Sequence, residues 1–420
     1  METRGSGPAS PWKRFVRFVA LGAFQAVLVM GVLRLVENHR GTRAWARYQA
    51  DLEEEGITLP ALLQPAPIGD HENFAAIFAG KSLPDLQEIS RAATRPYALF
   101  QIRFDPGEPI ETGPLETLLR VGQRYRARAL ASLNQGLPDK ACDDLVTLLR
   151  LAHHTEAIPL LAGAETEAAI LNLVFQPLWQ GLAMRQWPES ALKTVQEHLE
   201  AFDLIGNWPR LVKGEQLHVL SKTERMVQRR RYWREIFPKG WLYQNGVSTR
   251  SFFEVLMPLV VQPVNQTVVP HLAEAIDYNI THLVSHHPYR FLAAELLPQL
   301  APTLYKMAYT QATLRQAALA CALERYRIAR QEYPRSLRHL IPRYLRDFPV
   351  DPMTGGPMRY SLTEDGGYQI YSIGWNMIDD GGAVASPVPE NPRQSAGDWV
   401  WRMPGFPLEG EEHGFVKKGP

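Results

Sequence analysis

Cysteine is scarce in this chain, whose 420 residues contain only Cys142 and Cys321. So few cysteines exclude a disulfide-stapled scaffold and a cysteine-ligated metal site. Each cysteine lies in an Ala/Leu-rich stretch with helical periodicity, so we expect two buried free thiols. A single disulfide between them, in an oxidising compartment, is the alternative.

An excess of charge of one sign is also missing. The chain has 45 basic and 44 acidic residues, a formal net charge of +1, so no global field attracts nucleic acid or an acidic substrate. With 45% hydrophobic and 21% charged residues, the composition is that of a folded protein. The length exceeds what one hydrophobic core usually organises, and it predicts two or three folded units.

Catalytic signatures are lacking as well. The chain has no Gly-x-Ser-x-Gly elbow, P-loop, Gly-x-Gly-x-x-Gly fingerprint or His-Glu-x-x-His motif. Adjacent histidines on a helix point about 100° apart, which disfavours a shared metal at His153-His154 with Glu156, or at His286-His287. We therefore predict no catalytic residue and no enzyme activity.

Two groups of residues each leave an alternative interpretation open. An envelope hydrolase would place its site in the helical body, around His153, Glu165 and Glu215. Glu165 and Glu167 could form paired carboxylates, although a solvated helix face is the simpler interpretation. The run Arg229–Arg234 includes Tyr232 and Trp233, and it is interpreted as a solvated face, with membrane headgroups as the alternative. Nucleic acid is not expected as a partner.

What the chain does have is an apolar segment near its start. Residues 18–33 contain no charge and a single glutamine. As a helix they span about 24 Å, whereas the bilayer core is roughly 30 Å thick. Extending the segment to 15–36 closes the gap, because Arg17 and Arg34 can snorkel to the two interfaces. The sequence therefore predicts a transmembrane anchor over residues 15–36, with the lipid bilayer as partner.

A cleaved signal peptide and a buried core helix are the competing interpretations of this segment. No small-x-small cleavage site follows the apolar run, which favours an uncleaved single span with Trp12 at the interface. Basic residues flank both ends, so the positive-inside rule discriminates little. The short N-terminal tail favours a cytoplasmic N-terminus, and we expect a single-pass protein of the bacterial inner membrane with its bulk extracytoplasmic.

After the span, the periodicity predicts a mainly helical body. A polar helix from Ala44 to Glu55 is followed by a linker marked by Pro60, Pro65 and Pro67. Residues 115–133 and 138–154 form a helical hairpin. Further helices are expected at 157–185, 189–204, 209–231, 250–260, 264–286 and 303–330.

The pattern changes after the last helix. Pro334 stops it, and Ser336 can cap a short helix. Residues 358–362 and 368–373 alternate as β-strands joined by an Asp-Gly-Gly turn, and Trp399–Trp401 could add an edge strand.

This C-terminal run, ALACALERYRIARQEYPRSLRHLIPRYLRDFPVDPMTGGPMRYSL followed by GYQIYSIGWN, DDGG and GDW, resembles the periplasmic domain of the major pseudopilin of type II secretion. The matching turn has its Pro, Asp and Gly positions in the same order: Pro349, Asp351, Pro352, Gly355 and Pro357. The resemblance covers roughly residues 303–400. It implies a long helix against a small antiparallel sheet, and envelope or secretion-machinery proteins as partners.

The resemblance also implies a calcium site in the loop after the last strand, a hard oxygen site built from side chains and carbonyls. The corresponding residues here are Ser372, Asn376, Asp379, Asp380 and Asp398. Asn376 stands where the family tends to carry Asp, which weakens such a site. The alternative is that Asp379-Asp380-Gly381-Gly382 is a solvated turn.

One departure limits the resemblance. Pseudopilins begin with a Gly-Phe processing site and carry a Glu five residues into the mature chain, within an apolar helix. Here Glu37 lies beyond the span, and some 260 residues separate the span from the pseudopilin-like part. The chain is therefore not expected to be a fibre subunit. Trp45, Tyr48, Gly56 and PAPIGDHENFAAI are also similar to a group of large uncharacterised bacterial membrane proteins.

The predicted fold class is mainly α, with a small C-terminal α+β unit and one N-terminal transmembrane helix. We predict a non-catalytic, membrane-anchored extracytoplasmic assembly or scaffold protein. The expected units are a cytoplasmic tail (1–14), the anchor (15–36), a membrane-proximal helix and linker (37–114), the helical body (115–300), the pseudopilin-like unit (301–403) and a flexible tail (404–420).

Overall fold

The structure is a computed structural model, and it describes residues 11–57, 68–78, 84–100, 113–228, 238–262, 264–282, 287, 289–384 and 397–404. Within these residues the chain is mainly helical, with a C-terminal antiparallel sheet of three strands and one N-terminal helix that is a candidate membrane span. The predicted fold class is thus confirmed. Several predicted features lie outside the described residues: most of the N-terminal and C-terminal tails, Pro60, Pro65 and Pro67, the basic run Arg229–Arg234, and His286.

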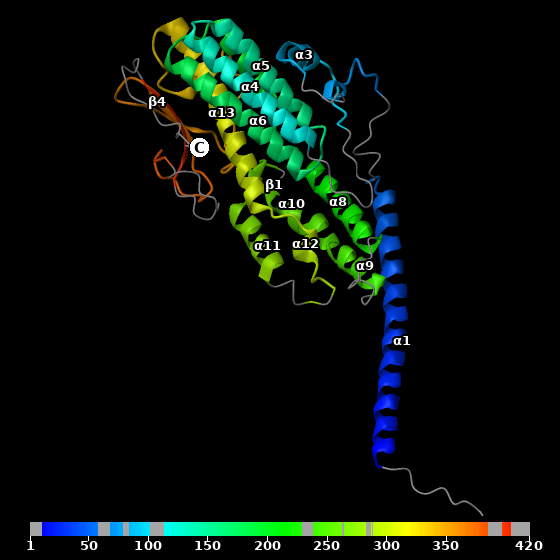
Figure 1. The fold of residues 1–420 in the computed structure, drawn as a ribbon. Helices are drawn as coiled ribbons and strands as arrows, with labels where there is room; N and C mark the ends of the chain where they lie inside the picture. Colours follow the sequence, from blue (N-terminus) through cyan, green and yellow to red (C-terminus); the bar gives the residue numbers. More distant parts are fainter. Residues whose placement is uncertain are drawn as a thin grey trace, which may run out of the picture.

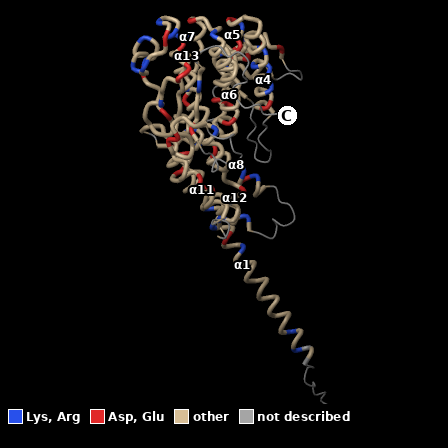
Figure 2. Tube along the Cα trace, turned by 90° about the vertical axis from the view of Figure 1, so that its left-hand side faces the viewer, with Lys and Arg blue, Asp and Glu red and all other residues tan. Residues whose placement is uncertain are grey.

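The first helix, α1 (Pro11–Glu54), is a single helix of 44 residues that projects from the rest of the molecule (Figure 1). The predicted span and the predicted helix from Ala44 are therefore parts of one continuous element. By length and composition α1 can cross a membrane, and 0% of its apolar window is buried. This exposure contradicts the interpretation of the segment as a buried core helix. Figure 2 shows the projecting part of α1 as mostly uncharged.

The second half of α1 docks on α9 (Lys239–Ser248). The two backbones nearly touch at Gly41 and Gly240, where a Cβ built on Gly41 would lie 2.1 Å from the Gly240 carbonyl oxygen. Further along, Trp45 stacks on Tyr243 at 5.3 Å between ring centroids. The prediction of a polar helix over Ala44–Glu55 was wrong on one face. There Trp45, Tyr48 and Leu52 form a buried cluster with residues of α8 (Trp208–Gln228) and α9.

The body is a bundle of long helices (Figure 1). They are α4 (Gly113–Asn134), α5 (Pro138–Thr155), α6 (Leu161–Ala183), α7 (Glu189–Glu200), α8 (Trp208–Gln228) and α13 (Ala301–Arg330). Shorter helical elements connect or cover them: η1 (Phe74–Phe78), α3 (Leu86–Ala92), η3 (Phe252–Leu256), α10 (Met257–Leu259), α11 (Pro270–His282), α12 (Ala293–Leu296) and η5 (Leu337–Leu340).

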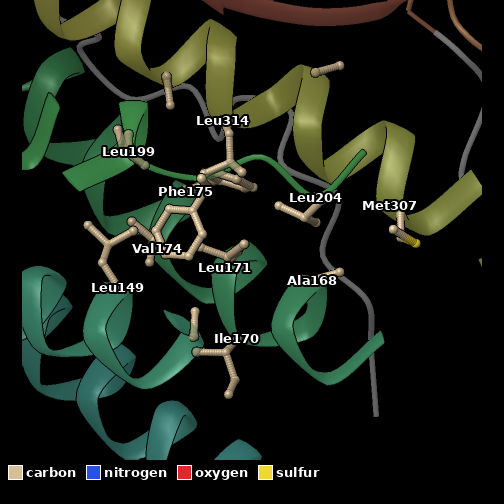
Figure 3. Close-up of a cluster of buried hydrophobic side chains, with 14 of the residues drawn as sticks. Leu149, Ala168, Ile170, Leu171, Val174, Phe175, Leu199, Leu204, Met307 and Leu314 are labelled. Carbon is tan, nitrogen blue, oxygen red and sulfur yellow. The ribbon is translucent and has the colours of Figure 1, made fainter. Parts of the chain in front are cut away.

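Helix α13 lies at the centre of this arrangement, in contact with α6, α7, α11 and the C-terminal sheet. Its small residues Ala308, Ala312, Ala317 and Ala320 are fully buried, which lets neighbouring elements approach closely. Figure 3 shows larger side chains of α6, including Phe175, facing α13 near Leu314. One continuous buried cluster includes residues of both the helical body and the C-terminal unit.

The C-terminal sheet has the order β3-β4-β5, and both pairings are antiparallel. Its strands are β3 (Arg359–Leu362), β4 (Tyr368–Ser372) and β5 (Trp399–Met403). Ile370 of β4 pairs with Tyr360 on one side and with Trp401 on the other. Gly366 takes the positive φ that the β3-β4 turn needs (φ +81°). The predicted hairpin and the predicted edge strand are both present.

A second, two-stranded sheet was missed by the sequence analysis. Strand β1 (Val261–Gln262) lies between the predicted helices 250–260 and 264–286, and it pairs antiparallel with β2 (Thr267–Val268), which falls inside the second of them. The turn between them includes Gln266 at positive φ (φ 50°). The backbone amide of Val268 also donates to the Pro352 carbonyl (2.9 Å), so tertiary contact with the C-terminal unit supports a strand there. Helix α11 accordingly begins only at Pro270.

Both cysteines are free and buried, as expected. Cys142 lies on α5 and Cys321 on α13. Burial raises the pKa of the Cys142 thiol to about 11 and that of Cys321 further. Both side chains therefore behave as small apolar core residues.

The glycine contact between α1 and α9 gives a first prediction. Gly41→Val should push the two helices apart and lower the free energy of unfolding by about 1–3 kcal/mol, the usual range for overpacking. Gly31→Val is the matched control, because a Cβ there meets no atom of the described residues within 4 Å. Thermal unfolding in detergent, followed by circular dichroism, measures both. Equal melting temperatures for the two variants would show that the close contact is not needed.

Candidate functional site

The three side chains of the hydrolase alternative are each held by different partners. Glu215 is buried on α8, and its carboxylate accepts the Leu161 amide at the start of α6 (2.8 Å). Glu165 accepts the Thr303 hydroxyl (2.6 Å) and pairs with Lys306 (3.0 Å), so it joins α6 to α13.

His153 lies 3.3 Å from the Glu156 carboxylate at the end of α5, and this contact raises the pKa of the imidazole. Glu215, by contrast, accepts a hydrogen bond from the Leu161 amide, which has no acceptor within its own helix because it lies at the N-terminus of α6. Burial raises the pKa of its carboxyl group to about 7. Each of the three predicted residues thus has a local structural partner.

The structure forms a different carboxyl pair. Glu167 of α6 is 4% exposed and lies beside Glu156, in a pocket whose lining also includes Asn207 and Arg210. Burial, followed by the charge of Glu156, raises the pKa of Glu167 to about 9, while Arg210 lowers it. Glu167 is therefore a neutral acid at pH 7. Among the residues that the structure describes, its Oε1 has no hydrogen-bond partner.

Glu165 and Glu167 were interpreted as a solvated helix face, with paired carboxylates as the alternative, and the burial of Glu167 contradicts the solvated face at that position. Ala164, Glu167 and Leu171 recur at intervals of three and four and are all buried on one face of α6. Glu165 lies off that face. The position of Glu167 in the apolar stripe of the helix was the sequence signal that predicts its burial.

The adjacent histidines of α5 point to different surroundings. His154 is buried, its Nε2 lies 3.1 Å from the Ala93 carbonyl oxygen, and its ring stacks on Phe74 at 4.3 Å. Burial lowers the pKa of His154 to about 4, so the ring is neutral and acts as a core side chain.

His287, from the other histidine pair, is exposed, and its Nδ1 accepts the Tyr289 amide (3.3 Å).

The predicted calcium residues form a hydrogen-bonded turn beside β5. Asp398, 1% exposed, accepts the amides of Gly382 (2.6 Å) and Asp380 (3.3 Å). Asp379 accepts the Gly381 amide (3.1 Å) and the Arg359 guanidinium (2.8 Å). These contacts keep the Asp379 pKa below its usual range, whereas burial raises that of Asp398.

The other two predicted ligands also have protein partners. The Asn376 amide donates to Asp380 (3.1 Å), and the Ser372 hydroxyl donates to Asp351 (2.7 Å) at the base of the 349–357 turn. In the part of the chain that the structure describes, no group of three or more His, Cys, Asp and Glu side chains could hold a metal ion. Calcium therefore remains a prediction of the sequence resemblance, without a preformed carboxylate cage.

No model of a known protein family matches this chain, and comparisons with curated proteins and with solved structures likewise found no match.

The calcium prediction is tested by melting the protein with and without calcium. A ligand that binds only the folded state stabilises it, by about 2.7 kcal/mol when the ligand concentration is a hundred times Kd. This stabilisation raises the melting temperature. A site at the turn predicts a rise with calcium, a smaller rise with magnesium, and no rise in Asp380→Ala. Arg359→Gln frees Asp379 and should enlarge the calcium effect. An unchanged melting temperature would remove the metal from this turn.

The buried acid gives a prediction about pH. Glu167 keeps its proton in the folded state, whereas the unfolded chain loses it above the usual value of 4.5. Between that value and pH 9 the folded state binds more protons, so its stability falls as pH rises, by about 1.4 kcal/mol per unit for one group.

Glu167→Gln should therefore flatten the dependence of the melting temperature on pH and stabilise the protein most near pH 9. Glu165→Gln, two residues away, serves as the control and should leave the slope in place. A Glu167→Gln protein with the slope of the unmodified protein would contradict a buried neutral acid.

Proposed function

We propose that this chain is a non-catalytic assembly or scaffold protein of the bacterial cell envelope, anchored in the inner membrane by α1 with its bulk extracytoplasmic. The observation that carries the proposal is the division of α1 into two halves. The first half is apolar and bare, and the second half is docked on the body. A bare apolar helix is unfavourable in water and favourable in a bilayer.

The manner of docking supports a role in holding the body at a defined place. Besides the Gly41–Gly240 contact, Arg250 pairs with Asp51, and Gln49 donates to Glu224 of α8 (2.7 Å). These contacts join α1 to both α8 and α9. The anchor is therefore continuous with a supported helix and is not followed by a flexible linker, which suits a protein that positions others.

The C-terminal unit supports the choice of partners. A long helix, a short η5 turn capped by Ser336 and a three-stranded antiparallel sheet follow one another, in the order that the pseudopilin resemblance implies. Trp399 of the sheet packs edge-on against Tyr305 and Tyr309 of α13 (5.7 and 5.5 Å). We expect envelope or secretion-machinery proteins as partners, with no nucleic acid.

A second candidate function rests on the Glu156–Glu167 pair. A neutral carboxylic acid beside a second carboxyl group can act as a general acid, and here it lines a pocket. An envelope hydrolase would use Glu167 in place of the residues first considered. Loss of a hydrolytic activity in Glu167→Gln, with the fold intact, would favour this candidate over the scaffold.

The anchor is tested by washing membranes with alkaline carbonate. The protein should stay in the pellet, because an apolar span is not removed by high pH. Val27→Arg with Val29→Arg places two charges in the span, at a cost of roughly 2.5–3.5 kcal/mol each, and should release a fraction into the supernatant. Val255→Arg with Leu259→Arg, on exposed positions of the body, is the control. Release of the unmodified protein would end the membrane proposal.

A further inference from the structure

Two parts of the body are fixed at the level where the predicted span ends. Glu37 is the first residue beyond 15–36, and its Oε1 accepts the Tyr289 hydroxyl (3.1 Å). The next residue, Asn38, accepts the Gly240 amide through its side chain (3.0 Å). Residues that are far apart in the sequence thus meet α1 immediately beyond its apolar half.

The direction of α9 shows that this end of the body is the one that faces the predicted span. Gly240, in the first turn of α9, lies against Gly41, whereas Arg250, just after its last turn, pairs with Asp51. Helix α9 therefore runs beside α1 in the same direction, with its start toward the span. In Figure 1 the start of α9 and the C-terminal end of α11 lie at a similar level along α1, at the side facing its bare half.

The side chains at this end are aromatic and basic. Trp241 packs edge-on against Tyr289 and Phe291, with ring centroids 6.4 and 6.3 Å apart, and all three are half-buried. Lys239 and Arg290, next to them in sequence, are exposed. Half-buried Trp and Tyr are typical of the membrane–water interface, where their apolar rings and polar edges both find partners. Exposed basic side chains there attract anionic headgroups.

We infer that this end of the body, defined by Lys239, Trp241, Tyr289, Arg290 and Phe291, rests on the headgroup layer of the same bilayer that α1 crosses. The inference rests on the proposed membrane anchor, because the position of the span in α1 determines where the bilayer surface lies relative to the body. It adds a second, peripheral membrane contact to the transmembrane one. The body then has a fixed orientation to the bilayer, with the C-terminal end of α13 pointing away from it.

The test places a fluorescent label at single cysteines of the full chain in lipid nanodiscs. Cys142 and Cys321 are replaced by alanine, and one cysteine is introduced at each of three exposed positions, by Phe24→Cys, Arg290→Cys or Arg338→Cys. Phe24 lies in the span and Arg338 in η5, beyond the far end of α13. Each label is then exposed to lipids that carry a nitroxide quencher near the headgroup or in the acyl chain.

We expect strong quenching at position 24 by the acyl-chain quencher, and at position 290 by the headgroup quencher. Position 338 should show at most a tenth of the quenching at 290. Position 290 behaving like position 338, while 24 is quenched, would overturn the surface contact and leave the anchor intact. Absence of quenching at position 24 would overturn the anchor itself and the contact with it. Melting curves of the three labelled proteins confirm that each is folded.

Discussion

The close approach of two glycine-bearing backbones, at Gly41 of α1 and Gly240 of α9, fixes how the projecting helix meets the rest of the molecule. Without a Cβ at either position the helices lie near enough for Asn38 to accept the Gly240 amide and for Trp45 to stack on Tyr243. Each of these contacts is short in range, so each depends on the same helix separation. The direction of the apolar half relative to the body follows from this one packing constraint.

A second constraint acts at the centre of the body. Helix α13 presents alanines to its neighbours, and Trp399 of the C-terminal sheet packs edge-on against Tyr305 on its surface. Small side chains permit close packing, while the buried polar Gln316 donates to the Trp399 carbonyl (2.6 Å) and sets the position of β5. The C-terminal unit is therefore seated on the same core as the helical bundle, although its own strands could be recognised separately in the sequence.

The sequence was informative wherever a local rule decided the outcome. The apolar run of α1, the hairpin of α4 and α5, the cap at Ser336 and the Asp-Gly turn at Gly366 follow from composition, periodicity or turn chemistry. It was uninformative where partners are remote. The β1-β2 strands depend on Pro352, and the environment of Glu167 is set by Glu156 and Arg210 on other elements. The buried face of α1 could have been recognised from Trp45, Tyr48 and Leu52, which recur at intervals of three and four.

The continuity of α1 has a mechanical consequence. Past Pro11 the helix contains no proline, so nothing in its sequence provides a kink between the bare half and the docked half. A span that is longer than the local hydrocarbon thickness responds by tilting. If α1 crosses a bilayer as proposed, any tilt of the span is therefore passed on directly to the docked half and to the body that it holds.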